Sequence, residues 1–568
     1  MPRKVLLAIA ATFIVAAVIL AVSGGFRTTV GGFRISARSP LAASIAALIA
    51  GAAWFALARR DRAIATDLET AWGAIERNAS RLIGCVALIS FVVAAAFATR
   101  SASGADASGY LSQAQLWYEG KYWLQDGISL VLHEKLPDLE PGQWITTPLG
   151  WRPMGLPGMQ APTYPPGLPM LMSIPHGTAG IVGVTALISA SAALAVWSAG
   201  MMAGGVAGVI AAISLALSPV FLYQSIQPMS DVPATAAWMA AFVVAARTSR
   251  SFDAGLLCAL AVLIRPNLAP LAIAPLMISK NKWAFAIPLT LAAILLMLVQ
   301  RFWYGSPFKT GYGPVDGLFA LANVGPNAIR YVTWLVATAP VMLLAPLGFA
   351  RLKSDRQAQA LAAFAVFVVT AYLVYGVFEH WSYLRFLLPA LAVFAIFAAV
   401  ELSAWIDRWP ISSRAPILFG LVLGVSAFSL SAARSRDTFK LADQLRRVEQ
   451  VADFINDRVP SEAVLLSGEQ SGSMRYYTHR PIVRWEAATP EMLSKVVVAL
   501  EESGARVYIV LDAWENEPFL AKFKDVPAVA LDWPPIVDAG TSHRTRVWNL
   551  SDRARFLNGG QISTTRLQ

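Results

Sequence analysis

The chain has 568 residues, of which 56% are hydrophobic and only 14% are charged, and its formal net charge is +11. An average soluble domain contains about 25% charged residues, so this composition excludes a soluble globular protein and predicts a polytopic membrane protein. The basic residues are scattered over loops that we expect on both faces of the membrane. The net charge therefore gives no support for nucleic-acid binding.

Apolar runs of about 18 residues, each long enough to cross about 30 Å of hydrocarbon, recur along the chain. They lie at 5–23, 41–58, 82–99, 178–198, 203–221, 232–247, 284–300, 331–350, 358–378, 384–404 and 413–432. We expect about eleven membrane-spanning helices from these runs. Residues 1–23 also resemble a secretory signal peptide, but its removal would leave the later topology unchanged.

A further apolar stretch, 253–279, is interrupted by Arg265-Pro266-Asn267. The basic segments 247–250 and 280–282 flank it and should share the cytoplasmic face. The chain must then enter the membrane and return, although two arms of about a dozen residues reach only about 18 Å each. The pattern predicts a short or re-entrant hairpin with Arg265 near its tip.

Lysine and arginine are distributed unequally between the loops. With the N-terminus inside, the short inner loops hold sixteen of these residues and the short outer loops hold seven. This bias favours an N-inside orientation. We therefore expect a multi-pass protein of the bacterial inner membrane whose loop 100–177 and C-terminal tail both face the periplasm.

This organisation divides the chain into a membrane domain, 1–432, with the long outer loop 100–177, and a soluble domain, 433–568. The loop is rich in Trp, Pro and Gly, which is typical of short helices in the membrane interface. In the tail an amphipathic helix precedes a strand, a helix and a second strand, at 441–459, 463–467, 490–503 and 506–512. This order predicts a small α/β domain, which has neither of the common Gly-rich nucleotide-binding motifs.

Asp106 follows the apolar run 82–99 by a few residues and precedes Tyr110 in the polar loop. A carboxylate at the lip of a membrane helix suits an enzyme that joins a lipid-borne substrate to one from the water side. The alternative is that Asp106 caps a helix that begins at Ala107, since Asp is a favoured N-cap residue. Asp231 stands before the run 232–247 and has the same two interpretations.

Several short motifs occur in order along residues 80–400, and most fall on the predicted outer side. They are Asp106-x-x-x-Tyr110, Tyr164-Pro-Pro-Gly167, Ser218-Pro219, Ser230-Asp-Val-Pro233, Arg265-Pro-Asn267, Tyr304-Gly-Ser-Pro-Phe308 and Tyr383-x-Arg-Phe-x-x-Pro389. The set resembles the GT-C membrane glycosyltransferases, in the broad group of protein O-mannosyltransferases and lipid A aminoarabinose transferases. The resemblance implies a GT-C-like transmembrane bundle followed by the soluble α/β domain.

This family transfers a hexosyl or pentosyl group from a polyprenyl-phosphate carrier to an acceptor outside the cytoplasm, usually with inversion. By resemblance, Asp106 is the catalytic carboxylate of the first loop and Asp231 is the second outward carboxylate. The mannosyltransferases have Glu directly after the first of these, where this chain has Ala107. The acceptor stays open among a glycan, a lipid and a protein.

The residues fit the chemistry of such a transfer. Phosphate is a weakly basic leaving group that needs no second carboxylic acid to protonate it, whereas one carboxylate must accept the proton of the acceptor hydroxyl. We assign that role to Asp106. Cations must stabilise the charge that develops on the phosphate, and Arg265 and Arg385 are the candidates. An arginine at the depth of Arg265 could instead belong to a structural ion pair.

Tyr110 and Tyr164 either line the donor site or belong to the aromatic belt at the membrane surface. The sequence predicts no set of metal ligands, although a divalent metal ion stays a candidate cofactor. The membrane lipid and the polyprenyl-phosphate sugar are the expected partners.

Three other functions compete with this interpretation. One is another transferase of lipid-linked glycans, such as an oligosaccharide ligase. A second is a transporter or flippase of lipid-linked sugars, which would carry polar residues along several helices at mid-depth. A third is a scaffold without activity whose tail binds partners.

Overall fold

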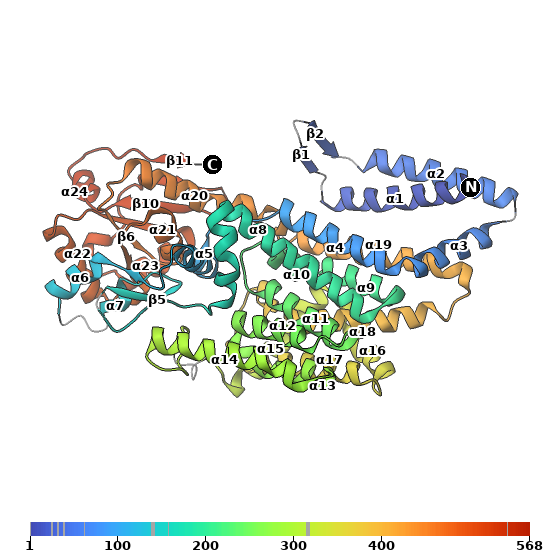
Figure 1. Cartoon of the computed structure of the whole chain (residues 1–568). Helices are drawn as coiled ribbons and strands as arrows, with labels where there is room; N and C mark the ends of the chain where they lie inside the picture. The colour runs from blue at the N-terminus through green and yellow to red at the C-terminus, as the bar shows by residue number, and fades with distance from the viewer. Residues whose placement is uncertain are drawn as a thin grey trace.

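The computed structural model describes residues 2–23, 26–30, 33–37, 40–61, 63–137, 142–156, 158–313, 318–541 and 543–567. A bundle of long helices occupies one end of the molecule, and the C-terminal α/β domain occupies the other (Figure 1). The predicted fold class, a transmembrane helix bundle with a C-terminal α/β domain, is confirmed.

The N-terminal helices form a small group beside the bundle (Figure 1). α1 (Pro2–Ser23) packs along α2 (Leu41–Arg60), and a hairpin of β1 (Phe26–Val30) and β2 (Phe33–Ala37) joins them. The chain continues through the amphipathic α3 (Ile64–Arg77), at a place where the sequence predicts only a loop. α3 buries Trp72 in a cluster with residues of α19 (Ile411–Arg434), and α4 (Ala79–Ala96) follows it.

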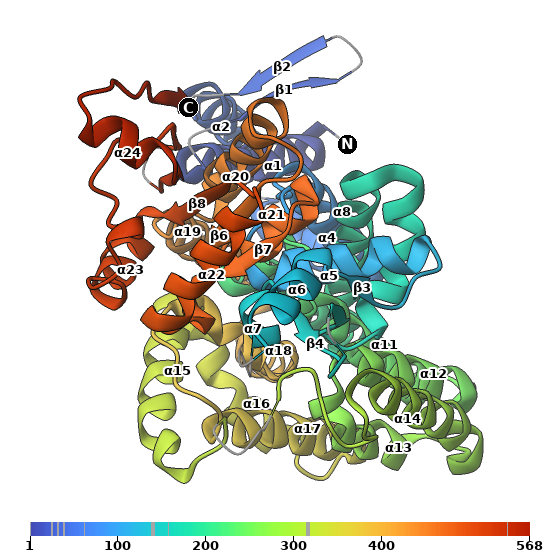
Figure 2. The ribbon, with the colours of Figure 1, turned by 90° about the vertical axis from the view of Figure 1, so that its left-hand side faces the viewer.

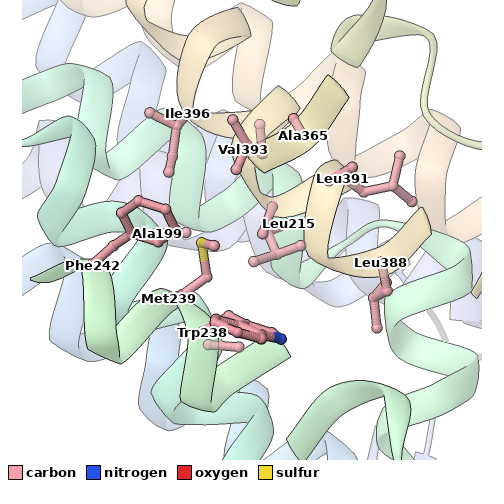
Figure 3. Close-up of a cluster of buried hydrophobic side chains, with 14 of the residues drawn as sticks. Ala199, Leu215, Trp238, Met239, Phe242, Ala365, Leu388, Leu391, Val393 and Ile396 are labelled. Carbon is pink, nitrogen blue, oxygen red and sulfur yellow. The ribbon is translucent and has the colours of Figure 1, made fainter. Parts of the chain in front are cut away.

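The centre of the bundle is an apolar core around α11. The elements that form it are α8 (Gly167–Ala203), α9 (Gly205–Ala216), α11 (Asp231–Arg247), α12 (Ser251–Ile264), α17 (Arg356–Leu373) and α18 (Leu388–Ile406). Figure 3 shows Trp238 and Phe242 of α11 in this core, together with Leu391 of α18. The many alanines on these helices allow the close approach that packing in a membrane requires.

Proline breaks two of the predicted spans. α9 and α10 (Pro219–Ser225) meet at an angle of 65°, within the run 203–221. In the run 331–350 the chain turns by 116° at Pro340, between α15 (Val324–Thr338) and the pair η3 (Pro340–Leu344) and α16 (Ala345–Leu352). Proline lacks the backbone N–H that a continuing helix needs, so the prediction of single helices is wrong at both places.

Within the described part of the chain, seven helices are long and apolar enough to cross a membrane, or up to nine if each bent pair counts as one span. Of the eleven predicted runs, 232–247 forms the shorter α11 with its 17 residues, which this count leaves out. The stretch 253–279 breaks at Arg265, as its sequence predicts. α12 ends at Ile264, and η1 (Pro266–Ala272) and α13 (Ile273–Ile278) follow.

The last elements that matter for the site are α14 (Lys282–Tyr304) and η4 (Trp381–Leu387). α14 packs along α12, and η4 leads directly into α18. Between α14 and α15, the described residues 305–313 and 318–323 contain one short helical element, η2 (Leu321–Asn323).

The outer loop is a folded unit. Its longest element is α5 (Gly104–Tyr118), which packs on α8. The three-stranded antiparallel sheet has the order β3-β5-β4, and α8 begins at Gly167, inside the predicted loop. The other elements of the loop are β3 (Leu124–Gln125), α6 (Gly127–Lys135), α7 (Gly142–Ile145), β4 (Trp151–Pro153) and β5 (Met159–Pro162).

The C-terminal domain is built on a six-stranded sheet with the order β11-β9-β10-β8-β6-β7. β6 is parallel to both β7 and β8, whereas β10 is antiparallel to its neighbours. The strands are β6 (Val464–Ser467), β7 (Ile482–Arg484), β8 (Val507–Asp512), β9 (Val537–Ala539), β10 (Thr545–Asn549) and β11 (Thr565–Leu567). The helices are α20 (Leu441–Arg458), α21 (Ser471–Thr478), α22 (Pro490–Glu502), α23 (Asn516–Lys522) and α24 (Asp552–Leu557).

Both faces of this sheet are covered by apolar clusters. Neighbouring strand residues belong to different clusters because alternate residues of a strand point to opposite faces. Leu465 packs in a cluster with Val448 and Ile455 of α20. Its neighbour Leu466 packs in a second cluster, with Leu500 of α22. The four elements expected in the tail correspond to α20, β6, α22 and β8.

The outer loop and the C-terminal domain share a core. Leu132 of α6 and Ile145 of α7 belong to the same apolar cluster as the α22 face of the sheet. Figure 2, viewed from the end that carries the domain, shows α5, α6 and α7 beside α21 and α22. Because the two regions are packed together, the loop and the tail lie at the same end of the bundle.

Candidate active site

A cavity of about 1340 Å³ lies between the helix bundle and the C-terminal domain. Its walls come from α5, the segment before α8, the start of α11, the break at Arg265, α14 and η4, and the C-terminal domain adds Glu469 and Trp514. All six residues that the sequence singles out line this cavity. They are Asp106, Tyr110, Tyr164, Asp231, Arg265 and Arg385.

Asp106 lies in the first turn of α5, which begins at Gly104 with Ser103 as its N-cap residue, so Asp106 does not cap a helix starting at Ala107. One carboxylate oxygen, Oδ1, accepts a hydrogen bond of 2.7 Å from the Tyr164 hydroxyl. The other, Oδ2, accepts one of 2.8 Å from Nη2 of Arg385. About a third of the side chain stays exposed, at 33%, so the carboxylate is both held in place and open to the cavity.

The surroundings of Asp106 set its charge. Burial alone raises the pKa of this carboxyl, but Arg385, the Tyr164 hydroxyl and Arg265 together hold it below its ordinary value of 3.8. Asp106 is therefore ionised at neutral pH. A carboxylate has about four lone-pair positions, so two hydrogen bonds leave capacity to accept a proton from a third group.

Asp231 is buried, with 1% of its side chain exposed, and it faces two arginines. Its Oδ1 lies 2.9 Å from Nη2 of Arg265, and its Oδ2 lies 3.9 Å from Nη1 of Arg385. With Asp106, the four residues alternate in charge: Asp106, Arg385, Asp231 and Arg265. The ion-pair alternative for Arg265 is therefore present in the structure, and Asp231 anchors both arginines.

Each arginine keeps a donor that faces no acceptor. Among the described residues, nothing accepts a hydrogen bond from Nη1 of Arg265 or Nε of Arg385, and both atoms are buried. A buried donor without a partner costs about 1–3 kcal/mol. Oxygen atoms of an anion in the cavity would satisfy both donors, and guanidinium groups suit a phosphate group well.

Two glycines explain how the Tyr164-Pro-Pro-Gly167 motif reaches the site. A Cβ atom on Gly109 of α5 would lie 2.3 Å from the Tyr164 ring, and one on Gly167 would lie 2.4 Å from the carbonyl carbon of Leu263. Only glycine allows either approach. The motif is thus clamped between the helix that carries Asp106 and the end of α12, next to Arg265.

Tyr110 and Tyr164 are buried side by side, with ring centroids 4.6 Å apart. Burial and the Asp106 carboxylate raise the pKa of both hydroxyl groups well above their ordinary value. Both tyrosines are therefore neutral donors at any physiological pH. Both tyrosines line the cavity beside Asp106.

The cavity also contains residues that sequence reasoning did not single out. Asn267 of the Arg-Pro-Asn motif donates a hydrogen bond of 2.9 Å to the Tyr372 hydroxyl and so holds that tyrosine at the wall. Tyr312 packs against Tyr164, with ring centroids 6.0 Å apart. No sequence pattern points to Glu469 or Trp514, because they reach the cavity only through the docking of the C-terminal domain.

In the described part of the chain, no three His, Cys, Asp or Glu side chains come together in a way that could hold a metal ion. Asp106 and Asp231 each face arginines instead. We assign no residue to a metal.

No protein-family model matches the chain, and no curated protein matches it in sequence. Solved structures do match it in fold. ArnT from Cupriavidus metallidurans bound to undecaprenyl phosphate has a TM-score of 0.52 at 11% identity, over 83% of this chain and 97% of that one. The apo state of ArnT gives 0.48 at 12% identity over the same shares of the two chains.

A further match is the oligosaccharyltransferase of Archaeoglobus fulgidus in the apo form, with a TM-score of 0.43 at 14% identity, over 78% of this chain and 71% of that one. The fold assignment depends on the match to ArnT bound to undecaprenyl phosphate, whose score is the highest of the three. The chain has the GT-C fold, and the resemblance noted in the sequence is confirmed at the level of the fold.

Proposed function

We propose that the protein is an inverting glycosyltransferase that moves a sugar from a polyprenyl phosphate to an acceptor on the outer side of the membrane. The observation that carries the proposal is the combination within one cavity of an ionised carboxylate, Asp106, and two arginines with unsatisfied donors, Arg265 and Arg385. The solved structure of similar fold that contains undecaprenyl phosphate supports this class of donor.

The two arginines bind the donor phosphate. Their free donors point to an oxyanion, and Asp231 behind them keeps both guanidinium groups in position. Apolar side chains of α14, among them Leu296 and Val299, line the same cavity. Because α14 has the length and composition of a membrane span, these side chains give the polyprenyl chain a route from the lipid to the phosphate site.

The oxygen of the acceptor hydroxyl attacks the anomeric carbon, and Asp106 accepts the proton of that hydroxyl. The bond from that carbon to the phosphate oxygen breaks, and the polyprenyl phosphate leaves with its charge stabilised by the arginines. Asp231 is buried and pairs with Arg265 at 2.9 Å, with Arg385 at 3.9 Å, so it serves the arginines and we assign it no covalent intermediate. A single displacement inverts the configuration at the anomeric carbon.

The site faces the periplasm in this proposal. The positive-inside bias favours an outer position for the loop 100–177 and the tail 433–568. The shared core of these two regions supports a common side for both. A bacterial inner membrane supplies a polyprenyl phosphate as the donor carrier.

The proposal is tested by deleting the protein in its native host and comparing envelope glycans by mass spectrometry. We expect one sugar residue to disappear and to return on complementation. Purified protein should bind undecaprenyl phosphate. An unchanged envelope together with an absence of undecaprenyl phosphate binding would contradict the proposal.

A further inference from the structure

The C-terminal domain closes the cavity with one particular edge of its sheet. Glu469 follows β6, and Trp514 follows β8. β6 and β8 are adjacent and parallel, pairing Val464 with Val507, so their carboxyl ends lie side by side. From β6 the chain passes to β7 on one side and later to β8 on the other. In open α/β sheets, ligands bind in the crevice at such a switch point.

Glu469 is held in this crevice by its backbone. Its N–H donates a hydrogen bond of 3.0 Å to Oε1 of Glu515, and the side chain of Gln470 accepts one of 3.4 Å from the N–H of Gly104. Oε1 of Glu469 lies 3.4 Å from the position that a Cβ atom would take on Gly104. Because Gly104 begins α5, the Glu469 carboxyl group sits at the start of the helix that carries Asp106.

The Glu469 carboxyl group and the Trp514 ring make no hydrogen bond, ion pair or stacking contact with the described residues. Among the described residues, none donates a hydrogen bond or forms an ion pair to the Glu469 carboxyl group, and none stacks on the Trp514 ring. The Trp514 side chain is 61% exposed, although it lies on the wall of a cavity. A free carboxyl group and a bare indole ring thus face the same space as Asp106.

We propose that Glu469 and Trp514 form the acceptor subsite and that the acceptor group they bind is a sugar ring of a glycan. A sugar ring has an apolar C–H face that packs on an indole ring, and its hydroxyl groups donate hydrogen bonds to a carboxylate. This inference rests on the proposed transfer reaction and names its acceptor class. The acceptor hydroxyl would attack the donor from this side and give its proton to Asp106.

The electrostatics of the subsite suit a neutral polyol. Burial, and then the neighbouring carboxylates of Glu515, Glu486, Asp512 and Asp106, raise the pKa of Glu469 to about 7. Glu469 is therefore about half protonated at neutral pH, and either form can exchange hydrogen bonds with hydroxyl groups. Glu469 has no cation paired with it among the described residues, so the subsite offers an anionic acceptor group no attraction, whereas a neutral sugar ring can hydrogen-bond to it.

The test compares complemented deletion strains of the native host. Strains would carry the wild type, Trp514→Ala, Trp514→Tyr, or the control Glu517→Gln, whose exposed side chain lies outside the cavity. Linkage analysis should show that the sugar missing from the deletion strain is bonded to another sugar. Losing one stacking contact of about 1.4 kcal/mol corresponds to about tenfold weaker binding of the acceptor, so Trp514→Ala should lower this product by up to about tenfold. Trp514→Tyr should restore most of it.

Binding of undecaprenyl phosphate to the purified full-length variants separates the subsite from the transfer reaction. We expect Trp514→Ala and Glu517→Gln to bind it like the wild type. Attachment of the sugar to an amino-acid side chain or to a lipid without a sugar headgroup would overturn the glycan assignment, as would full transfer by Trp514→Ala. A wild-type protein that neither binds undecaprenyl phosphate nor alters the envelope would instead overturn the proposed function and, with it, the subsite.

Discussion

Two walls of the same cavity differ in whether their carboxyl groups are paired with cations. On the membrane side, the arginine wall of Asp231, Arg265 and Arg385 pairs a buried carboxylate with two cations. On the side of the C-terminal domain, Glu469 lines the cavity, and Glu486, Asp512 and Glu515 lie near it outside the cavity lining; we call these four residues the acidic rim. Burial raises the pKa of Glu469 and Glu515 to about 7. In our proposal, an anion binds at the arginine wall and a neutral polar group binds beside Glu469 of the acidic rim.

Asp106 lies between the two walls, and its removal should have the largest effect. Asp106→Asn keeps the shape of the side chain but loses the basicity that accepts the acceptor proton, so we expect turnover to fall about 10²–10⁴-fold. The melting temperature should change little, because Ser103, not Asp106, is the N-cap of α5. Turnover by purified protein and its thermal unfolding check both points, and full activity in a folded Asp106→Asn variant would remove Asp106 from the mechanism.

Arg265 can be removed from the arginine wall either alone or together with its partner Asp231. Arg265→Leu leaves the buried Asp231 short of a cation and should destabilise the protein by about 3–5 kcal/mol. The double variant Arg265→Leu/Asp231→Leu removes the whole pair, which is often tolerated, and should recover most of the stability. It should nevertheless fail to bind undecaprenyl phosphate, as measured on purified, folded protein.

A matched control for that experiment is Arg351→Leu/Glu401→Leu, since these residues form an ion pair away from the cavity. The control should bind undecaprenyl phosphate normally. If the double variant at Arg265 and Asp231 binds as tightly as this control, the phosphate role of Arg265 is wrong and its pair with Asp231 is structural only.

Substitution of Tyr164, which lies beside Asp106, should have a smaller effect on activity. Its hydroxyl donates to Asp106 and helps to hold the pKa of that carboxyl below 3.8. In Tyr164→Phe this pKa should rise, so activity, which needs ionised Asp106, should begin to fall at a higher pH on the acid side. A pH–rate profile measures the shift, which we expect to be about one unit or less. An acid limb at the wild-type pH would show that the hydrogen bond does not tune Asp106.

The acidic rim should produce the smallest effect, visible in stability rather than in activity. Burial and the nearby Asp512 carboxylate raise the pKa of Glu515 from an ordinary 4.5 to about 7. The folded state then binds a proton at Glu515 more tightly than the unfolded state, so the stability that Glu515 contributes is full below pH 4.5 and is lost as the pH rises to about 7. Glu515→Gln should flatten this decline in thermal unfolding between these pH values. A profile as steep as that of the wild type would assign the decline to other groups.

The sequence predicts the arginine wall better than the acidic rim, and the physical reason is locality. Arg265 is conspicuous because a charged residue beside proline interrupts an apolar stretch, and the break appears at that residue. Asp106 is conspicuous because it follows a membrane-length run by only a few residues. In both cases a few adjacent residues contain the whole signal.

Glu469 and Trp514 could not be predicted in this way. They sit in short connections after strands of a soluble domain, and their meeting with Asp106 depends on how α5 docks on α21. The pairing of Asp231 with Arg265 was likewise open, because no local pattern tells a phosphate-binding arginine from one in an ion pair. The proline breaks after α9 and α15 were missed because hydropathy alone does not register a missing backbone donor.

The central claim is that the arginine wall and Asp106 together transfer a sugar from a polyprenyl phosphate. The most direct measurement follows the lipid product. Purified wild-type protein is mixed with polyprenyl-phosphate-linked sugar and with envelope glycan from the deletion strain. Free polyprenyl phosphate is then quantified by mass spectrometry. We predict that polyprenyl phosphate is released in equal amount to the sugar gained by the glycan, and that Asp106→Asn releases about 10²–10⁴-fold less per unit time. Donor that stays intact with the wild-type protein, or equal release by the Asp106→Asn variant, would contradict the claim.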